Sequence, residues 1–118
     1  YRTGEELARA CEKLMELRQR YANLAINDKS KVFNTDLMQA LELESMLDCA
    51  EAVAVGARDR KESRGAHQRL DFTARDDQNF LKHTLSYYHP KEPPRVEYLD
   101  VVITKSQPGV RDYSGAKK

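Results

Sequence analysis

The segment from residue 34 to residue 62 constrains the fold more than any other part of the chain. Apolar residues recur along it at the spacing of an α-helix, and beyond Cys49 they occur on nearly every side. A helix that is apolar all round is buried on more than one side. We therefore predict one long helix over about 34–62, with Asn34 as its N-cap and Phe33 packed as a hydrophobic staple against Met38.

A second helical pattern precedes this segment, over about 4–24. Leu7, Cys11 and Leu14 form its apolar stripe, and Thr3 is a suitable N-cap. Because two helices cannot bury such faces alone, we predict a mainly α fold, an antiparallel and spectrin-repeat-like helical bundle. The sequence leaves open whether the first helix of that bundle is missing. An uncovered apolar face favours self-association, so we expect the isolated chain to form a homodimer.

Composition narrows the classes of partner. The two cysteines, Cys11 and Cys49, fall within the helical patterns, and we interpret both as small buried apolar residues rather than as a disulfide. The 118 residues are predicted to form a single domain, 1–118. A net charge of +1 argues against nucleic acid or an anionic membrane surface as partner. No apolar run approaches the roughly 18 residues of a transmembrane helix.

Beyond the long helix we expect little regular structure before a small hairpin. Residues 63–82 are predicted to form a charged loop, with a short helical turn that begins near Asp76. Two β-rich stretches on either side of a proline-rich loop predict a β-hairpin over about 83–104. A two-stranded hairpin is too small to be stable without packing on the helices. The polar tail, 105–118, is expected to be flexible.

The charged loop and the residues just before it are dense in arginine, aspartate and histidine. A fixed charge near a core needs a partner, so we expect ion pairs within the chain or against another surface. Phosphate or nucleic acid is the alternative partner. Interleaved acidic residues neutralise the arginines, however, and no aromatic residues alternate with them. Internal ion pairs are therefore the preferred interpretation. The basic residues concerned are Arg58, Arg60, Lys61, Arg64, Arg69 and Arg75.

No arrangement of residues in the sequence indicates catalysis. His67, His83 and His89 lack the spacing of metal ligands, and we expect the first two to be hydrogen-bonded to nearby carboxylates or carbonyls. Asp76 and Asp77 are adjacent, so their side chains diverge, whereas general acid–base catalysis needs them to converge. There is no glycine-rich nucleotide loop and no Ser–His–Asp set. We assign no catalytic, cofactor-binding or metal-binding residue.

The charged loop also carries a distinctive pattern, which continues on both sides of it. In order and spacing this pattern resembles the C-terminal region of the flavoprotein subunits of the succinate dehydrogenase and fumarate reductase family. The resemblance covers essentially the whole chain. The strings that carry it are Phe33-Asn34-Thr35-Asp36-Leu37, Leu41-Glu42-Leu43, Glu62-Ser63-Arg64-Gly65-Ala66-His67, Arg69 and Asp71, Arg75-Asp76-Asp77, and Lys82-His83-Thr84-Leu85.

The resemblance implies that the chain is the C-terminal helical domain of an FAD-dependent enzyme. That enzyme interconverts succinate and fumarate and passes electrons to an iron–sulfur subunit. In this family FAD is held by a separate N-terminal Rossmann-like domain, so the chain alone would be inactive and would bind no FAD. The expected partners are that flavin-binding domain and the iron–sulfur subunit. The expected location is the cytoplasmic side of a membrane, reached through partner subunits and without direct membrane insertion.

The resemblance also gives the charged loop a role in interfaces. It implies that the loop is part of a scaffold that closes against the flavin-binding domain and helps to shape the docking surface of the subunit. The interface and scaffold residues it indicates are Arg64, His67, Arg69, Asp71, Arg75 and Asp77.

Two other functions are weighed against this one. The first is a stand-alone helical adaptor or scaffold module, but the start at Tyr1, without a methionine or a signal peptide, indicates a fragment of a longer protein. The second is the C-terminal domain of L-aspartate oxidase, a relative with a similar Glu-Ser-Arg-Gly signature that usually lacks the later strings. The preferred direction, succinate oxidation or fumarate reduction, is left open.

Overall fold

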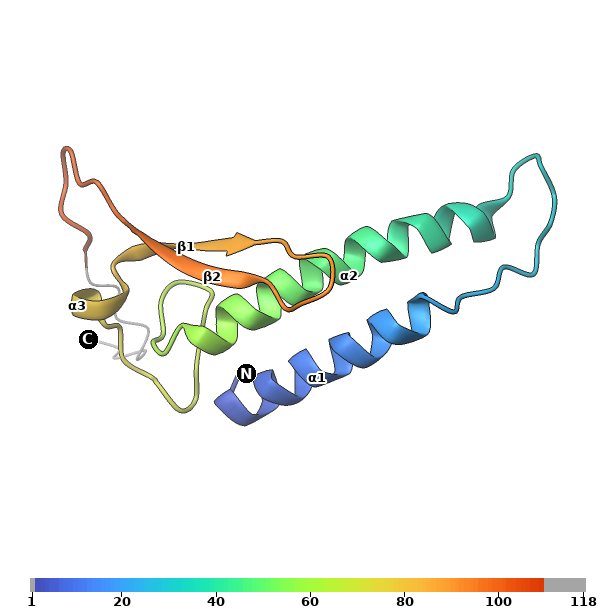
Figure 1. The fold of residues 1–118 in the computed structure, drawn as a ribbon. Coiled ribbons are helices and arrows are strands. Elements are labelled where there is room, and N and C mark those ends of the chain that lie inside the picture. Colours follow the sequence, from blue (N-terminus) through green and yellow to red (C-terminus); the bar gives the residue numbers. More distant parts are fainter. Residues whose placement is uncertain (1, 110–118) are drawn as a thin grey trace, which may run out of the picture.

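The computed structural model describes residues 2–109 and shows a long helical hairpin with a small sheet packed along one of its helices (Figure 1). In chain order the elements are α1 (Gly4–Tyr21), α2 (Thr35–Asp59), the short α3 (Asp77–Phe80), β1 (Lys82–Tyr87) and β2 (Arg95–Asp100). The predicted mainly helical fold with a small antiparallel hairpin is confirmed. The spectrin-repeat-like arrangement stays a prediction. Residues 110–118 of the predicted flexible tail lie outside the described residues.

A capping box begins α1. Thr3 Oγ1 accepts a hydrogen bond from the Glu6 N–H at 3.2 Å, and the Glu6 carboxylate accepts one from the Thr3 N–H at 3.2 Å. These two bonds occupy N–H groups that have no partner within the helix. The predicted N-cap is therefore confirmed, while the helix ends at Tyr21 rather than at residue 24.

The sequence interpretation of the ends of α2 is correct for the N-cap but wrong for the staple and for the last residue. Asn34 is the N-cap, as predicted, and its Oδ1 accepts from the Leu37 N–H at 2.8 Å. The expected staple is wrong, because Phe33 is 94% exposed and has a φ of 51°, in the left-handed region that bulky residues rarely adopt. The helix ends at Asp59 rather than at residue 62, because Arg60 has extended backbone angles.

The core between the helices is small. Its side chains come from the facing sides of α1 and α2 and from one residue of β2. The burial predicted for both cysteines is correct for Cys11 and wrong for Cys49, which is exposed on α2. The core cluster consists of Cys11, Ala54 and Val55, with Leu14 and Val96 packed against it.

The two strands pack along the C-terminal half of α2 (Figure 1). Their register pairs Lys82 with Asp100 and Tyr87 with Arg95. The hairpin therefore spans residues 82–100 rather than the predicted 83–104. Gly56 faces β1, and a Cβ added there would lie 3.6 Å from Thr84 Cγ2. The sheet is therefore supported by the helix that precedes it, close to the point where that helix ends.

Candidate functional site

The segment between α2 and β1, which includes α3, contains all six residues to which the resemblance gave interface and scaffold roles. It lies at the end of the helical hairpin where α1 begins and α2 ends (Figure 1). Two further residues at the start of this loop, Arg60 and Glu62, complete its network of ion pairs. We call the whole set the charge cluster. Its members are Arg60, Glu62, Arg64, His67, Arg69, Asp71, Arg75 and Asp77.

Arg69 is 2% exposed and joins the ends of the two helices. Its Nε and Nη2 each donate to one carboxylate oxygen of Asp71 at 2.7 Å, and its Nη1 donates to the Ala57 carbonyl at 3.0 Å and the Arg58 carbonyl at 3.1 Å. The Asp71 carboxylate also accepts from the Gly4 N–H at 2.7 Å. A cation thus meets the negative end of α2 and an anion meets the positive end of α1.

The ion pair fixes the charge on both partners. Hydrogen bonding to Asp71 raises the pKa of Arg69, and the same bond from Arg69 holds the pKa of Asp71 far below its usual range. Arg69 is a planar donor that bonds a carboxylate at two points. Both shifts favour the charged form of each partner.

Glu62 is the centre of the charge cluster and is 0% exposed. One of its oxygens accepts from Arg60 and from Arg64 Nε, and the other accepts from Arg64 Nη2 at 3.0 Å and from the Asp76 N–H at 2.8 Å. Burial acts to raise the pKa of Glu62, but the hydrogen bonds from Arg64, Asp76 and Arg60 outweigh it and lower that pKa. Glu62 is therefore an ionised carboxylate held in the interior.

The outer part of the charge cluster is a chain of three residues that are partly exposed. Arg64 donates to one oxygen of Asp77 at 2.6 Å, and Arg75 donates to the other at 2.7 Å. Arg75 also donates to the Gly109 carbonyl at 2.7 Å. The hydrogen bonds that Asp77 accepts, first from Arg64 and then from Arg75, lower the pKa of Asp77. Because Arg64 binds Glu62 as well, it connects this outer row to the buried centre.

His67 lies between the chain start and the end of α2. Its Nε2 is 3.1 Å from the Arg60 carbonyl, which can only accept, so Nε2 carries the proton. Its Nδ1 then accepts from Arg2 Nη1 at 2.9 Å. Burial lowers the pKa of His67, and the positive charges of Arg2, Arg69 and Arg60 lower it further. The prediction that a carbonyl satisfies His67 is thus correct, and the ring is neutral.

Arg60 belongs to the charge cluster although the resemblance did not indicate it. Its side chain connects the end of α2 to the start of β1. Its guanidinium donates to the Phe80 carbonyl at 2.8 Å, to the Lys82 carbonyl, and to Thr84 Oγ1 at 3.0 Å. It also lies 5.6 Å from the centre of the Phe80 ring, within the range of a cation–π contact. The spacing Arg60, Glu62, Arg64 could have indicated the site, because an acid flanked by two arginines can be buried.

The ion pairs of the charge cluster saturate one another, so far as the structure describes the chain. In the part of the chain that the structure describes, every buried side-chain nitrogen or oxygen has a hydrogen-bond partner, and no three His, Cys, Asp or Glu residues are grouped as metal ligands. Its carboxylates have lowered pKa values, whereas a general acid needs a raised one. Over the same residues, no helix is long and apolar enough to cross a membrane.

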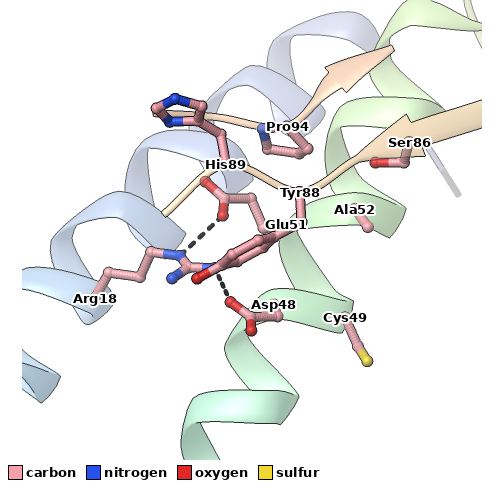
Figure 2. Close-up of a pocket in the computed structure, with 9 residues that line it drawn as sticks. All are labelled: Arg18, Asp48, Cys49, Glu51, Ala52, Ser86, Tyr88, His89 and Pro94. Atoms are coloured by element: carbon pink, nitrogen blue, oxygen red, sulfur yellow. Dashed lines mark hydrogen bonds and ion pairs between the residues drawn. The ribbon is translucent and has the colours of Figure 1, made fainter. Parts of the chain in front are cut away.

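A cleft lies between the helical hairpin and the loop of the sheet (Figure 2). Its volume is about 190 Å³, whereas small-molecule sites usually have about 300 Å³ or more. A neighbouring, more open cleft, lined among others by Tyr21 and Pro90, has a volume of about 420 Å³. Arg18 extends from α1 between Glu51 and Asp48 of α2, and its Nε donates to Glu51 at 2.8 Å (Figure 2). The polar groups on this wall are thus paired with one another.

The comparisons with known proteins identify the family. A model of the fumarate reductase flavoprotein C-terminal region matches residues 1–113. This chain therefore belongs to the family of fumarate reductase and succinate dehydrogenase flavoprotein subunits, as the C-terminal domain.

Individual relatives agree with this assignment. The chain is 56% identical over 117 residues to the fumarate reductase flavoprotein subunit of Proteus vulgaris, covering 98% of this chain and 20% of that protein. It is 38% identical over 118 residues to the succinate dehydrogenase flavoprotein subunit of Rickettsia bellii, covering 100% and 20%. Its structure matches the FrdA subunit of E. coli quinol fumarate reductase with a TM-score of 0.90 and 50% identity, covering 99% and 20%. The chain spans about a fifth of the length of these relatives.

Proposed function

We propose that this chain is the C-terminal domain of an FAD-dependent flavoprotein subunit that interconverts succinate and fumarate and passes electrons to an iron–sulfur subunit. The match of the family model to residues 1–113 carries this proposal. Fumarate reductase flavoprotein subunits are 48–56% identical to the chain, and succinate dehydrogenase flavoprotein subunits 38–41%.

The domain itself has a structural and interface-forming role in this proposal, and the active site lies elsewhere in the parent protein. The described residues do not fit FAD, because their sheet is a two-stranded antiparallel hairpin, whereas a dinucleotide binds where a parallel βαβ unit ends in a glycine-rich turn. The partners are the flavin-binding domain of the same protein and the iron–sulfur subunit. The parent is then cytoplasmic and bound to the membrane through its partner subunits.

Within the charge cluster the two roles separate by what the side chains bind. Arg69, Asp71 and His67 bind the ends of the helices, so they act as the scaffold. Arg64, Arg75 and Asp77 are partly exposed and form a row of charges at the surface, so they form the contact with a partner. A charged row held rigidly by its own ion pairs loses little conformational entropy on binding.

The test uses the intact parent enzyme, co-expressed with its iron–sulfur subunit. The Asp77→Asn variant keeps the shape of the side chain and removes the charge that holds Arg64 and Arg75. We expect less iron–sulfur subunit to co-purify with it, and a corresponding loss of fumarate reduction. The matched control is Lys13→Gln, which removes an exposed ion pair with Glu16 on α1. Undiminished assembly of both Asp77→Asn and Arg64→Gln would contradict the interface role.

We also propose that the isolated chain is a homodimer. Large apolar side chains are exposed along α2 and the loop before it, among them Phe33, Met38, Leu41 and Met46. An apolar face of this kind favours association. Static light scattering over a range of concentrations measures the mass, and a monomer at every concentration would refute the homodimer while leaving the family assignment intact.

A further inference from the structure

The segment that leads into α1 is held to the charge cluster at two points. The Leu70 N–H donates to the Arg2 carbonyl at 2.9 Å, and Arg2 Nη1 donates to His67 Nδ1 at 2.9 Å. The first turn of α1 is held separately, because the Gly4 N–H donates to Asp71 at 2.7 Å. The segment before the helix and the helix itself are therefore attached by different groups.

Of the two contacts of Arg2, only the one to His67 depends on a proton. A guanidinium has N–H donors and no acceptor, and it stays charged. It can therefore donate to His67 Nδ1 only while that nitrogen is unprotonated. The other ring nitrogen, Nε2, is 3.1 Å from the Arg60 carbonyl and carries the proton of the neutral ring. A second proton must then go to Nδ1, where it abolishes the bond from Arg2.

The backbone of His67 is fixed, so Arg2 is the partner that moves. The His67 N–H donates to the Arg64 carbonyl at 3.0 Å, and its carbonyl accepts from the Arg64 N–H at 2.8 Å, which closes a two-residue turn. Gly65, the first residue inside that turn, has a φ of 58°, which glycine adopts without steric cost. The side chain of Arg2, by contrast, is partly exposed and can turn towards solvent.

The charges around His67 are all positive. Arg2 lies ahead of α1, Arg60 follows α2, and Arg69 belongs to the same loop as the ring. Burial lowers the pKa of His67 most, and these three charges lower it further, against the opposing hydrogen bond to the Arg60 carbonyl. The carboxylates of the charge cluster already accept from arginines. A protonated ring therefore faces cations, and the repulsion drives Arg2 away.

We propose that His67 is a proton-operated latch on the segment that leads into α1. With a neutral ring the latch is closed, and Arg2 is bound to the charge cluster. As the pH falls through the range in which histidine titrates, about 8 to 5, the ring takes up a proton, the bond from Arg2 is lost and the segment loosens. The two helices stay joined, because Asp71 remains ionised and bound to Arg69 over this range.

The position of the latch gives it a consequence for the parent enzyme. The chain is the C-terminal domain of its family, so the segment ahead of α1 is where the preceding part of the flavoprotein subunit joins this domain. The latch then sets, through the pH, how firmly that junction is tied to the charge cluster. This consequence rests on the function proposed above, whereas the latch itself is a property of the chain.

Nuclear magnetic resonance of the 118-residue chain tests the latch in two ways. Long-range proton–nitrogen spectra report the protonation of each ring nitrogen, and we expect His67 at pH 7.5 to carry its proton on Nε2 alone. Amide exchange then reports the segment itself, through the Leu70 N–H that bonds Arg2. After correction for the intrinsic exchange rate, we expect its protection to fall about threefold or more between pH 7.5 and pH 5.

An internal control separates release of the latch from general loosening. The Ser63 N–H donates to the Ala74 carbonyl at 3.0 Å within the same loop and does not involve Arg2. Its protection should be equal at the two pH values. A parallel loss of protection at Ser63 and Leu70 would mean that the whole loop opens, and it would overturn the latch.

Two variants assign the effect to the pair. His67→Gln does not titrate, so the protection of Leu70 should no longer depend on pH, whereas His83→Gln, at an exposed position outside the charge cluster, should leave the dependence intact. Arg2→Met removes the donor and should give low protection at both pH values. A ring protonated on Nδ1 at pH 7.5, or a pH dependence that persists in His67→Gln, would refute the proposal while leaving the family assignment and the proposed function untouched.

Discussion

Arg69 and Asp71 form a two-point ion pair that binds the last turn of α2 to the first turn of α1. The guanidinium donates to both carboxylate oxygens at 2.7 Å while it also reaches the Ala57 carbonyl at 3.0 Å. The carboxylate in turn accepts from the Gly4 N–H at 2.7 Å. Two residues in one loop therefore satisfy backbone groups at two helix ends that come from distant parts of the sequence.

Replacing Arg69 tests how strongly the helical hairpin depends on this pair. Arg69→Met keeps much of the volume but leaves Asp71 and the carbonyls at the end of α2 without their donor. A hydrogen bond to a charged group contributes about 1.5–3 kcal/mol. Because Asp71 is one-third exposed and water can take the place of the lost donor, we expect a loss of about 2 kcal/mol in the free energy of unfolding, measured in urea. Arg9→Met is the control, because its ion pair with Glu5 is largely exposed and is worth less than about 0.5 kcal/mol. Equal losses in the two variants would contradict the role of Arg69.

The pH dependence of stability has two stages. The pKa of His67 is lowered in the folded chain, chiefly by burial, so the unfolded chain takes up this proton at a higher pH. Stability should therefore fall as the pH decreases below about 7, through the ordinary histidine pKa of about 6.5. The pKa values of Glu62, Asp71 and Asp77 are also lowered. A second and steeper loss should begin below about pH 4, where these groups become protonated in the unfolded chain.

A variant of His67 separates the two stages. His67→Gln offers a neutral acceptor and a neutral donor, and we expect it to flatten the free energy of unfolding between pH 7 and pH 5 while the loss below pH 4 remains. His83→Gln is the control, because His83 is exposed and lies outside the charge cluster. Urea titrations at each pH give the measurement. A slope between pH 7 and pH 5 that survives in His67→Gln would assign it to another group.

Two glycines in helices should respond to alanine with opposite signs. A Cβ on Gly4 would lie 3.2 Å from both Arg69 Nη2 and Asp71 Oδ2, so Gly4→Ala presses on the ion pair and should destabilise the chain by about 1 kcal/mol. A Cβ on Gly56 would make an ordinary contact with Thr84 at 3.6 Å. Gly56→Ala should therefore stabilise α2 by about 0.5–1 kcal/mol, because alanine has the higher helix propensity. Thermal unfolding of the two variants gives the signs directly.

The backbone at Phe33 is a further target for stabilisation. Its φ of 51° is unfavourable for a bulky residue, and its ring is exposed rather than packed. Asparagine tolerates this region better, so we expect Phe33→Asn to raise the free energy of unfolding by roughly 0.5–1 kcal/mol. Val32→Asn, at the adjacent exposed position, should change it little. A loss of stability in Phe33→Asn would mean that the ring makes contacts that outweigh the strain.

Local chemistry made much of the fold predictable. Thr3 and Asn34 were identifiable as N-caps because their side chains bond the backbone of the next few residues, so that no distant contact is needed. The strands alternate and are separated by prolines, which is likewise a local signal. The helix ends were less predictable. α2 stops at Asp59 because Arg60 bonds groups on β1, more than twenty residues away, and that pairing has no local signature.

The charge cluster was predictable as a set of residues but not as a network. Composition indicated internal ion pairs, yet the arginines and carboxylates of the loop allow many pairings. Which of these pairings forms depends on which carboxylate the fold buries. That carboxylate is Glu62, which is 0% exposed. Cys49 shows the same limit, because its neighbours are apolar on most sides and the sequence cannot tell which of those sides α1 and the sheet will cover.

The uneven placement of the charge cluster has a consequence for motion. Its ties lie at one end of the helical hairpin, while the opposite end, with Tyr21 and Thr35, is spanned by a loop whose hydrogen bonds are local and mostly exposed. Amide protons should accordingly exchange with solvent fastest near that loop and slowest beside Arg69. Local opening of the fold should therefore begin at the loop between the helices and reach the charge cluster last.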